Sequence, residues 1–84
     1  MKIIKVIETI ERREDYPFRD EAYLVGRVED GRYFFAWGPE YPYADEVPAD
    51  DIPDGESGIS FHDKLDEALE AMEAAVKAVE ALRG

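Results

Sequence analysis

The sequence contains no cysteine, no asparagine and no glutamine, and it has a single threonine. Without cysteine the chain can form no disulfide, no thiolate nucleophile and no cysteine-based metal site. It has no apolar run whose length approaches the roughly 20 residues needed to cross a bilayer. The start, Met1 to Lys5, is interrupted by charge too early for a secretory signal. We therefore expect no membrane partner and a cytoplasmic or recombinant origin.

Basic residues are also scarce: 10 Lys and Arg stand against 21 Asp and Glu, which gives a net charge of −11. The imbalance is greatest in residues 38–60, which hold seven acidic residues and no basic one. Binding to a phosphate backbone requires Lys and Arg, so direct nucleic-acid binding is not expected. A negative field instead attracts basic protein surfaces.

The 84 residues suffice for one domain with one modest core. β-Branched residues favour a central strand over residues 2–12, although a helix through Ile3, Ile7 and Ile10 would also fit the spacing. Residues 22–29 and 32–37 are predicted to be two further strands. Residues 38–60 are predicted to be an acidic loop rich in Pro and Gly, and 61–83 a helix.

Asp30-Gly31 is typical of a two-residue hairpin turn. In that register Leu24 pairs with Trp37 and Gly26 with Phe35, whose ring would cover the glycine. One face would then carry the residues that pack against the helix: Ala22, Leu24, Gly26, Val28, Tyr33, Phe35 and Trp37. Phe34 and Tyr23 would lie on the opposite face.

Ser60 to Asp63 resembles a capping box that opens the C-terminal helix. Beyond it, apolar residues recur with helical spacing from Phe61 and Leu65 to Leu82. We therefore predict an α+β fold, a two-layer sandwich with one C-terminal helix on an antiparallel sheet. The sheet would have three strands, or four if a short strand forms near residues 46–47 or 58–60.

Residues 65–84 are almost entirely strong helix formers, and filling a helix by propensity is a habit of protein design. With the missing Asn, Gln and Cys, the sequence resembles computationally designed α+β mini-proteins; a thermophilic or GC-rich source would show a similar depletion. A looser likeness concerns Tyr33, residues 39–42, Gly58 and residues 65–69, whose order is similar to the strand–loop–helix of HicB-type antitoxins. The segment between is longer than in that family, and the family's further strand has no counterpart.

Aromatic and acidic residues are the candidate partner-binding groups. Tyr and Trp dominate interface hot spots, which favours a contact role for aromatics off the helix-facing side and in the loop. The alternative for Phe34 is a surface cation–π pair with Arg27. The full set of candidate partner-binding residues is Tyr23, Phe34, Tyr41, Tyr43, Asp45, Glu46, Asp50 and Asp51.

No cofactor or metal site is predicted. From Asp50 the third and twelfth positions of a calcium loop would be Ile52 and Phe61, which cannot serve as ligands. His62 is the only histidine, and Ser57 and Ser60 have no placed base, so no catalytic constellation is predicted and we expect no enzyme activity.

The predicted function is a protein-binding domain of designed character that engages a basic partner through exposed aromatics and the acidic loop. One alternative is an acidic nucleic-acid mimic or phage-type inhibitor, in which carboxylates replace phosphates. Another is a scaffold with no function beyond folding.

Overall fold

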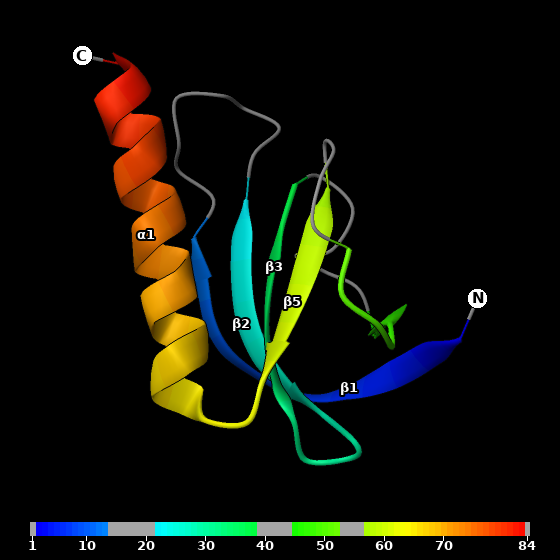
Figure 1. The fold of residues 1–84 in the computed structure, drawn as a ribbon. Helices are drawn as coiled ribbons and strands as arrows, with labels where there is room; N and C mark the ends of the chain where they lie inside the picture. Colours follow the sequence, from blue (N-terminus) through cyan, green and yellow to red (C-terminus); the bar gives the residue numbers. More distant parts are fainter. Residues whose placement is uncertain (1, 14–21, 39–44, 53–56, 84) are drawn as a thin grey trace.

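The computed structural model describes residues 2–13, 22–38, 45–52 and 57–83. An antiparallel sheet in the order β4-β1-β2-β3-β5 curls beside one C-terminal helix (Figure 1). The elements are β1 (Ile3–Arg13), β2 (Tyr23–Val28), β3 (Tyr33–Trp37), β4 (Glu46–Pro48), β5 (Gly58–His62) and α1 (Leu65–Arg83). The predicted α+β sandwich is confirmed. The sheet has five strands, because both short strands considered within residues 38–60 form, so that segment is not simply a loop.

β1 is a strand and not a helix, and it lies between β4 and β2 as expected of a central strand. Its register with β2 shifts between Val6 and Glu8 and again between Thr9 and Glu11. Each shift inserts one extra residue, Ile7 and then Ile10, and such bulges bend a strand and increase its twist. β1 is therefore strongly curved (Figure 1). Its first half pairs with β4, and its second half approaches α1.

The β2–β3 hairpin has a longer loop than predicted. The Gly31 N–H donates to the Val28 carbonyl at 2.9 Å, and the Val28 N–H donates to the Arg32 carbonyl at 3.0 Å. The loop is therefore three residues long, and Gly31 has a φ of 96°. A type I turn followed by a left-handed glycine has this form. The predicted two-residue register is wrong by one position.

This one-residue shift moves each β2 side chain to the opposite face from the one predicted, because side chains on a strand alternate between the two faces. Leu24 now pairs with Ala36, and Gly26 pairs with Phe34 instead of Phe35. A Cβ at Gly26 would lie 2.8 Å from the Phe34 ring, so Phe34 is the aromatic that covers the glycine. Leu24 and Val28 consequently pack away from the helix, contrary to the prediction.

Two apolar clusters result, one on each face of the curled sheet. The helix-side cluster joins α1 to the sheet and includes Tyr23, Val25, Phe35, Ala68, Met72 and Val76, with Tyr33 and Trp37 packed against it. The opposite cluster contains Ile4, Leu24, Val28, Phe34, Ala36, Val47 and Ile59. The β3 residues predicted to face the helix do so, while the second cluster was not predicted.

The helix begins at Leu65, so the predicted start at Phe61 and the capping box are wrong. Ser60, Phe61 and His62 belong to β5 and pair with β3. Asp66 and Glu67 lie in the first turn of α1, where negative charge is stabilised by the helix dipole. The helix and the end of β1 are joined by Arg13, which donates to Glu73 at 2.6 Å.

Candidate functional site

Residues 45–52, four of which are acidic, include β4 and link β1 to β5. At one end, the Val6 N–H donates to the Asp45 carbonyl at 2.8 Å, and the Ala49 N–H donates to the Lys2 carbonyl at 3.0 Å. At the other end, Ile52 and Ile59 exchange two backbone hydrogen bonds of 2.9 and 3.0 Å. The segment thus closes the curled sheet and covers the cluster opposite the helix (Figure 1).

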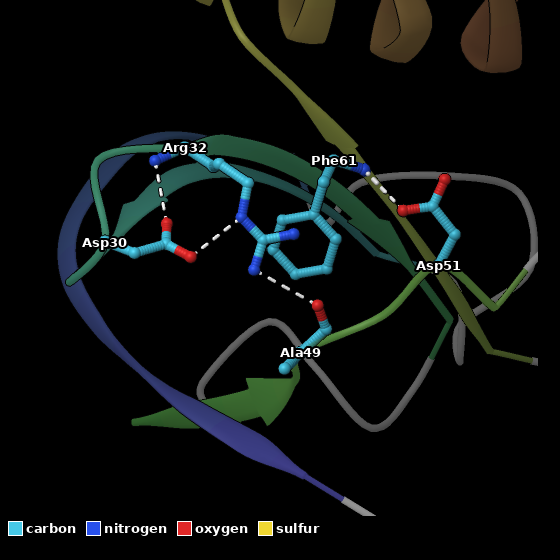
Figure 2. A network of polar contacts seen from close by, with 5 residues as sticks. All are labelled: Asp30, Arg32, Ala49, Asp51 and Phe61. Carbon is cyan, nitrogen blue, oxygen red and sulfur yellow. Dashed lines mark hydrogen bonds and ion pairs between the residues drawn. The ribbon is translucent and has the colours of Figure 1, made fainter.

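Arg32 fastens the β2–β3 turn to this segment (Figure 2). Its Nε donates to Asp30 at 2.9 Å and its Nη2 donates to the Ala49 carbonyl at 3.1 Å. The guanidinium lies 4.2 Å from the centroid of the Phe61 ring. A cation–π contact therefore exists, but between Arg32 and Phe61. The Arg27–Phe34 pair considered from the sequence does not form, since Phe34 is buried and Arg27 lies beside Glu8 at 3.5 Å.

Asp30 is held ionised by the same arginine. The Arg32 backbone N–H donates to its carboxylate at 3.0 Å, and the guanidinium adds a second hydrogen bond. These two bonds, the backbone one first, lower the pKa of the Asp30 carboxyl below its ordinary value.

The four described acidic candidates have different surroundings. Asp51 accepts the Phe61 N–H at 3.1 Å and so caps the outer edge of β5 (Figure 2). Glu46 is the cross-strand partner of Lys5. Asp45 and Asp50 are exposed, and among the described residues neither forms an ion pair. Of these four, Asp45 and Asp50 are the exposed carboxylates that have neither a hydrogen bond from Phe61 nor a lysine across the strands.

The two described aromatic candidates, unlike the acidic ones, are buried. Phe34 is 0% exposed and Tyr23 is 4% exposed, so the expectation that these two aromatic side chains are exposed is wrong. Phe34 lies on the face away from the helix, as predicted, but the second cluster encloses it. Tyr23 stacks on Phe35 with ring centroids 6.0 Å apart on the helix side. Tyr41 and Tyr43 lie outside the described residues.

The structure brings together one pair that sequence reasoning missed. The Ser60 Oγ and the His62 Nε2 are 2.8 Å apart, because residues two apart on a strand share a face. The prediction that Ser60 has no placed base is thus corrected. A working nucleophile also needs an orienting partner for the base. Among the described residues no hydrogen bond to the other imidazole nitrogen occurs, so the pair lacks such an orienting partner there.

Two exposed isoleucines were also missed. Ile3 is 57% and Ile7 is 49% exposed, whereas Ile4 is buried and Val6 packs against the second cluster. The alternation of Ile3 and Ile7 with Ile4 and Val6 was the available signal. The prediction of a central strand over residues 2–12 did not distinguish a covered face from an exposed one.

No group of His, Asp or Glu in the described ranges could hold a metal ion. Nor does the described part of the chain include a helix both long and apolar enough to span a membrane. No protein-family model matches the chain, and searches of curated proteins and of solved structures find no match.

Proposed function

We propose that this domain binds a basic protein partner through the carboxylates at the two ends of β4, and that it acts by binding and not by catalysis. The observation that carries the proposal is the availability of Asp45 and Asp50. Both side chains are exposed, and within the described residues no cation neutralises either of them.

The hydrogen bonds that hold the backbone around these carboxylates support the proposal. Asp45 itself accepts a hydrogen bond from β1, and Asp50 lies between Ala49 and Asp51, which are bonded to Arg32 and Phe61 respectively. Charges fixed before binding cost less conformational entropy when a partner arrives. The overall charge of −11 adds long-range attraction toward a basic surface. Because Tyr23 and Phe34 are buried, the proposal depends on the acidic members of the predicted set.

The test is the double charge reversal Asp45→Lys with Asp50→Lys, assayed by fluorescence anisotropy on a labelled lysine-rich peptide. Glu46 is left unchanged because a lysine there would face Lys5 across the strands. The matched control is Glu70→Lys with Glu80→Lys on exposed positions of α1, which changes the net charge by the same amount.

We expect the β4 reversal to weaken binding about tenfold, since each exposed ion pair contributes roughly 0.2–1 kcal/mol and reversal replaces attraction by repulsion. The helix control should change binding far less, and added salt should weaken binding by the wild-type protein. Equal losses in the two variants would show that only net charge matters and would refute a site at β4.

A further inference from the structure

The exposed isoleucines of β1 form part of one surface. Among the described residues, Ile3 and Ile7 are the only large hydrophobic side chains that are exposed. Cross-strand partners share a face, so Ile3 lies beside Pro48, and Lys5 lies beside Glu46. We call Ile3, Lys5, Ile7, Glu46 and Pro48 the β1–β4 outer face.

The helix does not cover this face. α1 packs on β2, β3 and β5, and β1 approaches it near its own C-terminal end, through Ile10 and Arg13. The first half of β1 runs away from the helix, toward the N-terminus (Figure 1). Two apolar side chains are therefore left in solvent on a strand whose inward-facing neighbours, Ile4 and Val6, are covered.

Strand addition does not suit the outer edges of the sheet. Asp45 and Ala49 bond to β1, so by the alternation of an antiparallel ladder Glu46 and Pro48 direct their backbone groups outward. Pro48 has no N–H to offer, and a charged residue and a proline are common protections of an edge. On β5, Ile52 and Asp51 already occupy the Ile59 and Phe61 backbone groups. We therefore expect a partner to bind the outer face and not to add a strand at an edge.

The spacing and the charge of the face define its occupant. Four residues of strand place Ile3 and Ile7 roughly 13 Å apart, close to the ~11 Å of two helical turns. On this face Lys5 lies across from Glu46, and Asp50 follows Pro48 by two residues, so carboxylates outnumber the lysine. A second copy of this chain would bring the same carboxylates and a charge of −11 against them, so self-association is disfavoured.

We propose that the β1–β4 outer face docks a basic amphipathic helix of a partner protein. Apolar residues two turns apart on that helix contact Ile3 and Ile7, and its Lys and Arg side chains reach Glu46 and Asp50. This inference rests on the proposed function and adds to it the shape and the apolar anchors of the partner.

The experiment uses a synthetic lysine-rich helical peptide with leucines two turns apart, and a scrambled peptide of the same composition. The test variant is Ile3→Thr with Ile7→Thr, which keeps β-branched side chains and so preserves strand propensity. The control variant is Ala74→Ser with Ala78→Ser on exposed positions of α1. Circular dichroism and thermal melting establish that each variant is folded.

We expect the ordered peptide to bind the wild-type protein more tightly than the scrambled one does. Ile3→Thr with Ile7→Thr should weaken binding about tenfold, since apolar anchors at the centre of an interface carry much of its affinity. The α1 control should bind like the wild type. In NMR titration, amide shifts should move in residues 3–7 and 45–50.

The outcomes separate the two proposals. If the isoleucine variant binds normally while the Asp45 and Asp50 reversal does not, the docking face is refuted and the acidic site stands. If the two peptides bind equally well, an amphipathic helix is not what the face recognises. Failure of both peptides to bind the wild-type protein would overturn both proposals.

Discussion

The two faces of the sheet are covered by different means. One face is covered by a single helix of 19 residues, and the apolar stripe of this helix can be recognised from the spacing of its own residues. The other is covered by β4 and residues 49–52, held by a few hydrogen bonds between residues far apart in the chain. A helix can be recognised from its own residues, whereas a cover made of short segments depends on distant partners. The second face therefore provides the tests that distinguish the structure from the sequence-based prediction.

The largest expected effect is that of Phe34→Ala. Phe34 is 0% exposed and belongs to the cluster opposite the helix, so its removal should cost about 3–5 kcal/mol of unfolding free energy. Met72→Ala, at the centre of the helix-side cluster, should cost a comparable amount, about 2–5 kcal/mol. Urea denaturation measures both. A loss below about 0.5 kcal/mol for Phe34, as expected for a surface residue, would contradict the second core.

A smaller effect is expected from Arg32→Ala, which removes the bond to the Ala49 carbonyl, the contact with the Phe61 ring and the exposed ion pair with Asp30. The first two of these contacts should together contribute about 1–2 kcal/mol to the free energy of unfolding. Arg27→Ala is the matched control on the same hairpin, because in the described part of the chain Arg27 forms a single ion pair, at 3.5 Å with Glu8. Equal losses for the two arginines in urea denaturation would mean that the Arg32 contacts do not fasten the segment.

The smallest expected effect is the pH dependence contributed by Asp30. Because its folded pKa is lowered from the ordinary 3.8, the carboxylate stabilises the fold above that value, and the contribution is lost as the pH falls through the folded pKa. Asp30→Asn should therefore reduce the loss of stability between neutral and acidic pH. Urea midpoints of the two proteins at both pH values provide the comparison. Identical pH dependence would show that the Arg32 hydrogen bonds do not favour the ionised form.

The sequence predicted the fold class, the strand character of β1 and the helix-facing residues of β3, since each depends on local pattern. It could not determine the hairpin register, because Asp30-Gly31 suits a two-residue turn and also a three-residue loop that ends in a left-handed glycine. That one ambiguity reversed the assignment of Leu24 and Tyr23. The bulges at Ile7 and Ile10 were equally hidden, since they depend on pairing with β2.

The candidate site was predicted in part. Composition alone identified the acidic segment, but it could not separate Asp51, which bonds to Phe61, from the exposed Asp45 and Asp50. The expected exposure of Phe34 was wrong because its face is covered by Val47 and Ile59, which follow it at a distance along the chain. The resemblance to designed mini-proteins stays a prediction.

The closure by residues 45–52 also bears on the order in which the protein folds. The β4 residues of this segment pair with β1 residues more than forty positions earlier in the chain. The β2–β3 hairpin and α1, in contrast, are formed by residues close together in the chain. Long-range contacts require the loss of loop-closure entropy before they add any stabilising free energy. We therefore expect the hairpin and helix to assemble early and the closure to form after the rate-limiting barrier. A weakened closure would then shorten the lifetime of the native state and leave the rate of its formation almost unchanged.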